Sequence, residues 1–256
     1  MIGRTIRFDR LFGNGRNAAL VAVDHGAEFG PTPGLMDFAP ALEKLSGADG
    51  ILLNPGMIES AAGFFGRPTA PRMVVRLTWT TAYCFPWNYT ESHTCQVMHA
   101  QDALAAGADF VMACCLVQSG SEALDRDNVR LFTEIVAQSH KAGVPIIGEL
   151  YPARAEEMPP EELHERVYRG ARILAELGAD AIKTFYTGDR FDEVCSSAAV
   201  PVLALGASKC GEREAIDKAR KAMRAGARGV VFGRNVFQAK NPPAFLKALK
   251  QTTASH

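Results

Sequence analysis

A lysine interrupts an apolar run in the second half of the chain, where Ala181 and Ile182 lead directly into Lys183. A buried amine is disfavoured in its charged form, and the neutral amine is a nucleophile that attacks carbonyl carbon. The iminium formed in that attack is an electron sink, which allows a neighbouring carbon–carbon bond to break or form. Lys183 is therefore a candidate for Schiff-base chemistry, and a structural lysine paired with a carboxylate is the alternative.

Such chemistry also needs groups that move protons, for dehydration of the carbinolamine and for the hydroxyl at the bond that is cleaved. Tyr151 and Asp24 have suitable chemistry and follow other apolar runs, and Glu149 is a spare candidate. A tyrosine at such a position also occurs as a packed aromatic ring whose hydroxyl lies in water. We predict that Lys183, Tyr151 and Asp24 are the catalytic residues.

Two glycine-containing turns near the C-terminus, GASK at 206–209 and GRN at 233–235, predict a phosphate site. They combine small residues, backbone N–H groups at helix starts and two cations, as the phosphate sites of α/β barrels do. An arginine that only forms a salt bridge with a neighbouring loop is the alternative for Arg234. His25, which follows Asp24, either assists the chemistry or contacts the phosphate. The predicted substrate- and phosphate-binding residues are His25, Gly206, Ala207, Ser208, Lys209, Gly233 and Arg234.

All these residues follow short apolar runs that alternate with helical patterns along the chain. Four of the runs are preceded by Gly-Ala-Asp or a variant of it, a proline opens or precedes three more, and AALVA near the N-terminus is the eighth. Eight strands, each followed by a helix, predict a (β/α)8 TIM barrel that forms a single domain over residues 1–256. An open doubly wound sheet is the alternative. In a barrel the C-terminal strand ends carry the active site, and Arg76 and Trp79 also stand there.

Other chemistries find less support in the sequence. There is no HExxH motif and no cluster of His and carboxylate residues with metal-ligand spacing, so we predict no metal and no cofactor. We expect His164 on a helix surface. Cys114 and Cys115 lie in an apolar run, which raises the pKa of a thiol, so packing is favoured over a nucleophilic role.

The composition describes a soluble globular chain with balanced charge. Lys and Arg total 28, as do Asp and Glu, so no net field would attract nucleic acid or an anionic membrane. We recognise neither a signal peptide nor a stretch of about 18 apolar residues that would span a bilayer. The six cysteines show no CxxC pair, which indicates reduced thiols and a cytoplasmic location. The expected partner is a small phosphorylated substrate, with no nucleic acid and no membrane.

Three segments resemble motifs of the archaeal-type class I fructose-bisphosphate aldolase family: AVDHG with GPTPGL, ADAIKTFYTGDRF, and GARGVVFGRNVFQAKNP. The resemblance spans roughly residues 21 to 249. It implies a barrel in which Lys183 forms the Schiff base while Asp24 and Tyr151 assist proton transfer. It also implies a homo-oligomer. The phosphate contacts that it implies come from Gly206, Ser208, Gly233 and Arg234.

Several positions depart from that family's pattern. Ala207 stands in place of the second glycine of a pair, Glu149 in place of a tryptophan, and the arginine expected nearby is displaced to Arg154. The aromatic loop AYCFPWNY is also atypical. Three aromatic residues of this region would line a pocket for a substrate half that carries no second phosphate: Trp79, Tyr83 and Trp87.

We therefore expect a lyase, a class I aldolase that cleaves or forms a carbon–carbon bond in a phosphorylated keto sugar or related phosphorylated ketone. Thiolase-like acyl transfer to coenzyme A on a phosphorylated diketone is one alternative. A non-catalytic phosphometabolite-binding barrel is another, although a binding protein has no need of a lysine, a tyrosine and an aspartate beside the phosphate turns. A metal-dependent aldolase would differ in losing activity to a chelator and regaining it with zinc.

Overall fold

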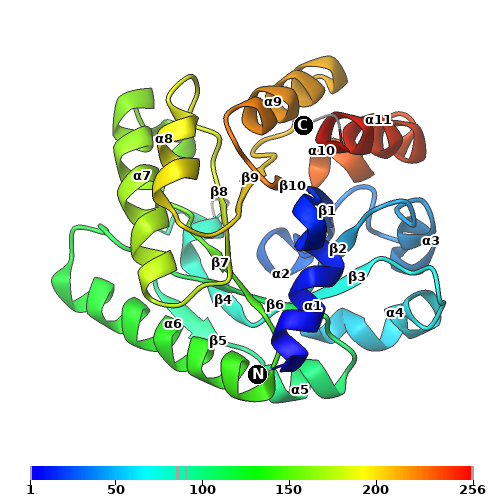
Figure 1. Ribbon diagram of the computed structural model, residues 1–256, viewed down its shortest axis with the longest axis horizontal. Coiled ribbons are helices and arrows are strands. Elements are labelled where there is room, and N and C mark those ends of the chain that lie inside the picture. The colour runs from blue at the N-terminus through cyan, green and yellow to red at the C-terminus, as the bar shows by residue number, and fades with distance from the viewer. Residues whose placement is uncertain (1, 85–86, 90, 255–256) are drawn as a thin grey trace.

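The strands of the computed structural model, which describes residues 2–84, 87–89 and 91–254, form a closed barrel (Figure 1). The order around it is β1-β10-β9-β8-β7-β6-β3-β2. Because β1 pairs in parallel with both β2 and β10, this sheet has no edge, and the open-sheet alternative is wrong. The barrel strands are β1 (Ala18–Ala22), β2 (Gly50–Leu53), β3 (Arg72–Arg76), β6 (Phe110–Cys114), β7 (Ile146–Glu149), β8 (Ala181–Thr184), β9 (Val202–Leu205) and β10 (Gly229–Phe232).

Helices lie between successive strands and surround the barrel, which confirms the predicted single-domain (β/α)8 fold (Figure 1). Each barrel strand is buried along nearly its whole length, because the helices cover one face and the barrel interior the other. The helices are α1 (Ile2–Phe12), α2 (Gly26–Phe29), α3 (Phe38–Glu43), α4 (Ile58–Phe65), α5 (Ala100–Ala105), α6 (Glu122–Ala142), α7 (Pro160–Glu176), α8 (Phe191–Ser197), α9 (Glu212–Arg224), α10 (Arg234–Phe237) and α11 (Pro242–Ala254).

Local sequence signals explain where α6 begins and ends. The Ser121 hydroxyl accepts a hydrogen bond from the Leu124 N–H at the N-terminus. At the other end Gly143 adopts φ 74°, a left-handed conformation that glycine takes without strain. Between these caps Phe132 and Ile135 are fully buried against the barrel. The helix therefore follows from its caps and its apolar face.

Helix α1 closes the N-terminal end of the barrel. Its residues Leu11 and Phe12 are buried within the cluster of side chains that fills the barrel interior. The Phe12 ring meets the ring of Phe110, the first residue of β6, edge-on, with centroids 6.1 Å apart. The N-terminal end is thus sealed by apolar packing, and the opposite end is left for polar side chains.

The strand register sets two polar residues side by side at that opposite end. Glu149 of β7 pairs with Lys183 of β8 and, on its other side, with Cys114 of β6. Neighbouring residues on parallel strands point to the same face of a sheet. The register therefore aims the Glu149 and Lys183 side chains into the same space.

A short antiparallel hairpin, which the sequence did not predict, is inserted after β3. It consists of β4 (Thr78–Thr80) and β5 (Thr94–Gln96). The indole Nε1 of Trp79 donates a hydrogen bond of 3.0 Å to the carbonyl of Ala27, so the hairpin is fastened to α2.

None of the helices in the described part of the chain is long and apolar enough to cross a bilayer.

Candidate active site

A cavity opens at the C-terminal end of the barrel. The strand ends and the loops after them supply its wall, as in the active sites of other α/β barrels. All three predicted catalytic residues face it. The described residues that line it are Ala22, Asp24, His25, Glu28, Phe29, Arg76, Tyr83, Glu149, Tyr151, Lys183, Leu205, Gly206, Ala207, Val231, Gly233 and Arg234.

Arg76, at the end of β3, is the centre of a buried charge network. Its Nε donates to the Asp24 carboxylate at 2.6 Å, and its Nη1 donates to the Glu149 carboxylate at 2.8 Å. The guanidinium is only 4 % exposed, so these two carboxylates must supply the stabilisation that water supplies elsewhere. The sequence placed Arg76 at a strand end but suggested no role for it.

Glu149 joins this network to the predicted nucleophile. Its carboxylate forms an ion pair with Nζ of Lys183 and accepts a hydrogen bond of 2.6 Å from the Tyr83 hydroxyl. Burial opposes the charged form of Glu149, but Arg76, Lys183 and the hydrogen bonds outweigh burial and lower its pKa to about 2. At neutral pH Glu149 is therefore an anion in contact with the lysine before substrate binds, rather than a spare residue.

Lys183 is buried, as expected, with 6 % of its surface exposed. The expected apolar surroundings are absent, because the register of β7 and β8 places Glu149 beside the amine. The amine thus begins as an ammonium held by a carboxylate. A nucleophilic role requires that a proton leave Nζ before attack.

Asp24 and His25 sit at the entrance to α2. Burial opposes ionisation of Asp24, but Arg76 and Lys183 outweigh it, so the pKa of this carboxyl lies below its ordinary value. Burial lowers the pKa of His25 to about 4, with Asp24 opposing the shift. At neutral pH the pair is therefore an aspartate and a neutral imidazole, with Nδ1 of His25 at 3.7 Å from the carboxylate.

Tyr151 is packed in the cavity wall. Its ring meets those of Tyr83 and Phe185, each with a centroid distance of 4.7 Å, and the residue is 9 % exposed. Burial raises the pKa of its phenol, so the hydroxyl keeps its proton at neutral pH. The alternative of a hydroxyl in open water does not describe this buried side chain.

Both predicted phosphate turns reach the cavity, but only some of their residues line it. Gly206, Ala207, Gly233 and Arg234 line the cavity. The guanidinium of Arg234 lies over the Phe29 ring, 5.7 Å from its centroid. Its Nη2 donates to the Ala207 carbonyl at 3.4 Å, and its Nε has no hydrogen-bond partner among the described residues. The alternative of a salt bridge to a loop finds no support in the ion pairs of the described residues.

Ser208 and Lys209 lie outside the cavity wall. Both are exposed, because Ala207 adopts φ 54° and the chain turns outward after it. The Ser208 hydroxyl donates to Glu156, and the Lys209 ammonium donates to the Gln238 carbonyl at 2.9 Å. The structure therefore does not bring these two side chains to the predicted phosphate site.

Glu28 is a residue of the cavity that the sequence analysis missed. It lies on α2, is 7 % exposed and lines the cavity. Burial raises its pKa to about 8, although Arg76 opposes the shift. Its position just after the DHG segment was a usable signal, because residues that follow a barrel strand at its C-terminal end face the active site.

The residues that depart from the family pattern fall in different places. Tyr83 lines the cavity, Trp79 is bound to α2, and Trp87 is about half exposed. Phe85 and Pro86 of the same loop lie outside the described residues. Arg154 is exposed and pairs with Glu157 at 2.6 Å, so it does not replace a cavity arginine.

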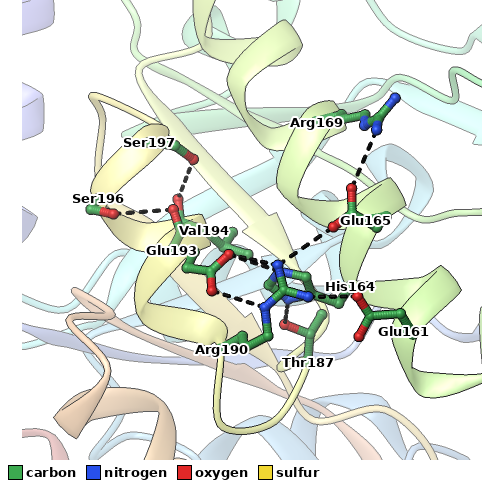
Figure 2. Close-up of polar contacts among 10 residues, drawn as sticks. All are labelled: Glu161, His164, Glu165, Arg169, Thr187, Arg190, Glu193, Val194, Ser196 and Ser197. Atoms are coloured by element: carbon green, nitrogen blue, oxygen red, sulfur yellow. Dashed lines mark hydrogen bonds and ion pairs between the residues drawn. The ribbon is translucent and has the colours of Figure 1, made fainter.

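His164 was expected on a helix surface, and that prediction is wrong. It is 2 % exposed, because α7 packs its ring against the loop between β8 and α8. Figure 2 shows Nδ1 of His164 facing the Thr187 hydroxyl, 3.0 Å away. In the same cluster Arg190 donates hydrogen bonds to Glu161 at 2.6 Å and to Glu193 at 2.8 Å (Figure 2). These contacts fasten the loop that follows the lysine strand.

The two adjacent cysteines behave as packed thiols. Burial raises the pKa of Cys115 to about 12 and raises that of Cys114 well above its ordinary value. Cys114 Sγ also lies 3.1 Å from the Tyr83 hydroxyl oxygen. A nucleophilic thiolate at neutral pH is therefore disfavoured, as expected.

Comparison with known proteins adds independent findings. A family model described as "DeoC/LacD family aldolase" matches residues 18–239. The chain is 32 % identical to the 2-amino-3,7-dideoxy-D-threo-hept-6-ulosonate synthase of Halobacterium salinarum, over 96 % of this chain and 90 % of that protein. It is 29 % identical to the 3-hydroxy-5-phosphonooxypentane-2,4-dione thiolase of an Enterobacter, over 97 % and 80 %.

A solved structure of an archaeal fructose-1,6-bisphosphate aldolase superposes with a TM-score of 0.79. The two chains are 26 % identical, with 98 % of this chain and 99 % of that one covered. In that protein the catalytic lysine is covalently bound to the carbinolamine intermediate of the substrate. The likeness thus extends over the whole barrel and includes a protein with lysine-based chemistry.

The charge network predicts a pH-dependent loss of stability in Glu149→Gln. Near neutral pH this change leaves Lys183 without its carboxylate, and we expect the free energy of unfolding to fall by about 3–5 kcal/mol. Glu149 has its pKa lowered from 4.5 to about 2, so its contribution is complete above the higher value and is lost as pH falls toward the lower one. Urea unfolding should therefore show the two proteins converging as pH falls over that interval.

Glu157→Gln is the matched control, because it removes a carboxylate from an exposed pair with Arg154. It should change stability little at any pH. Wild-type stability in Glu149→Gln near neutral pH would show that the network does not hold the strand ends together.

Proposed function

The chain belongs to the DeoC/LacD family of aldolases, and on that premise we propose that Lys183 of this class I aldolase forms a Schiff base with a phosphorylated keto sugar or ketone. One observation carries the proposal. The lysine is buried at the end of β8 and faces a cavity whose wall also holds Asp24, Tyr151 and the turn of Arg234. A lysine that served structure alone would not need an open cavity in front of its amine.

The phosphate of the substrate is proposed to bind at Arg234. Gly206 and Gly233 line the cavity beside the guanidinium, and a Cβ at Gly233 would overlap the His25 ring, so the turn can approach the cavity closely only as glycine. The Arg234 side chain offers N–H groups that the described residues leave unsatisfied. A phosphate dianion would accept charge-assisted hydrogen bonds from them, and it would fix the position of the carbonyl relative to Lys183.

Glu149 is proposed to handle the protons of imine formation. It accepts one proton from the Lys183 ammonium, and the neutral amine then attacks the carbonyl carbon. The carbinolamine nitrogen loses a proton to its own oxygen, and the proton held by Glu149 converts that hydroxyl into departing water. The products are an iminium on Lys183 and an ionised Glu149, so the pair has the same total charge as before.

Asp24 and Tyr151 are proposed to serve the carbon–carbon step. Asp24 is ionised and can accept the hydroxyl proton as the bond breaks, while the bonding electrons move into the iminium to give an enamine. Tyr151 retains its phenol proton and donates it to the enamine carbon, and the proton that Asp24 took up then returns through solvent to the Tyr151 oxygen. Water then hydrolyses the new iminium, which releases the ketone and restores the lysine.

Acyl transfer to coenzyme A is the second candidate, because one relative is a thiolase. The two reactions share the lysine and differ in the acceptor. Strict dependence of turnover on coenzyme A would favour acyl transfer, and turnover without it would favour the aldolase.

The cellular setting is part of the same proposal. All six cysteines are free, which suits a reducing cytoplasm. The family resemblance also suggests a homo-oligomer.

Lys183→Met should abolish turnover of any phosphorylated ketone that the wild type uses. We expect a loss of roughly a thousandfold or more, because the methionine cannot form an imine. Steady-state kinetics measure the loss, and circular dichroism verifies that the variant is folded. Lys209→Met is the control, since that lysine is exposed and bonded to the Gln238 carbonyl. A near wild-type rate in Lys183→Met would contradict the mechanism.

Arg234→Ala should raise KM for a phosphorylated substrate while leaving an unphosphorylated analogue nearly unaffected. The lost charge-assisted contact is worth about 1.5–3 kcal/mol. Paired kinetic measurements on the two substrates separate phosphate binding from a structural effect. If both substrates lose equally, Arg234 is a structural residue.

A further inference from the structure

The charges in the cavity are distributed unevenly between its two ends. One end holds Arg234 with the glycine turns, and the other holds the network around Arg76. Apart from His25 and the two tyrosines, the described ionisable side chains of the wall are three acids and three bases: Asp24, Glu28, Glu149, Arg76, Lys183 and Arg234.

Two of the three cations are already neutralised. Arg76 is bonded to both Asp24 and Glu149, and Lys183 is paired with Glu149. Arg234 is the one cation among the described cavity residues that has no carboxylate in ion-pair contact. The cavity therefore offers one site at which a phosphate dianion meets an unpaired positive charge.

Glu28, on α2 after β1, faces the cavity within reach of the charges around Arg76. It is 7 % exposed, and its carboxyl group forms no hydrogen bond or ion pair with another described residue. The charges that act on it belong to Arg76, Asp24, Glu149 and Lys183. The bond from Trp79 to Ala27, the residue before it, fixes α2 and with it the position of Glu28. Because it lines the cavity, its carboxyl group is available to a polar group of a bound ligand.

We infer that Glu28 is a specificity-determining residue that receives the unphosphorylated half of the substrate, and that this substrate carries a single phosphate and a hydroxyl or carbonyl group at its other end. The inference rests on the proposed function, because it concerns the ligand of the same cavity. A bisphosphate would place its second dianion beside Glu28, Asp24 and Glu149, where no described cation is unpaired.

The protonation of Glu28 makes the selection pH-dependent. Burial raises its pKa to about 8, with Arg76 opposing this and Asp24 and Glu149 adding to it. Below that pH the neutral acid can donate a hydrogen bond to a hydroxyl or carbonyl oxygen. Above it the carboxylate repels an anion, so discrimination against a second phosphate grows as pH rises.

Calorimetric titration with two unreactive polyols tests the inference. Mannitol 1-phosphate and mannitol 1,6-bisphosphate have no carbonyl group, so they report binding without imine formation. We expect the bisphosphate to bind about tenfold more weakly near neutral pH. We expect the ratio of the two Kd values to grow several-fold by about pH 9 in the wild type. In Glu28→Gln the ratio should stay constant over the same range.

Glu59→Gln is the control, since it removes an exposed carboxylate on α4, outside the cavity. It should reproduce the wild-type ratio at both pH values. Equal or tighter binding of the bisphosphate would overturn the inference, as would the same pH dependence in Glu28→Gln or failure of both polyols to bind. Failure of the lysine chemistry is detected separately in Lys183→Met kinetics, because the polyols do not react.

Discussion

The ion pairs of Arg76 are the interaction on which the rest of the site depends. A buried guanidinium is tolerated only where carboxylates replace its water, and here Asp24 and Glu149 do so at 2.6 and 2.8 Å. Because these residues come from the ends of β1, β3 and β7, the network fixes strands on different sides of the barrel relative to one another. Lys183 joins through Glu149, so its amine is held in place before any substrate arrives.

The two ends of the barrel differ: apolar packing stabilises the N-terminal end, and the candidate active site lies at the C-terminal end. At the N-terminal end α1 and the inner apolar cluster exclude water from the barrel interior. At the C-terminal end β3 and β7 finish in the charged residues Arg76 and Glu149, and α2, Tyr83 and the turn of Arg234 complete the cavity wall. Substitutions in the end loops can therefore change the ligand without altering the barrel.

Much of the fold could be predicted from the sequence, because each barrel strand is an apolar run and seven of the eight have a glycine or proline at or near their start. Lys183 could be identified for the same reason, as a charged residue within such a run. The role of Glu149 could not, because its contact with Lys183 depends on the register between β7 and β8, and register is a property of the pairing. Arg76 was placed at a strand end, but its partners come from distant segments of the chain. Ser208 and Lys209 have the right chemistry for phosphate, yet the backbone turn at Ala207 directs them outward. His164 was misjudged because its burial comes from the loop packed on α7.

The central claim is that a carbonyl substrate becomes covalently attached to Lys183. The most direct measurement is borohydride reduction in the presence of a panel of phosphorylated ketones, followed by intact-mass analysis and peptide mapping. The proposed chemistry predicts one added substrate, less the oxygen lost as water, on the peptide that contains ADAIKTFY. It also predicts that the adduct is absent from Lys183→Met. An adduct on Lys209, or no adduct with any ketone that the protein turns over, would contradict the account.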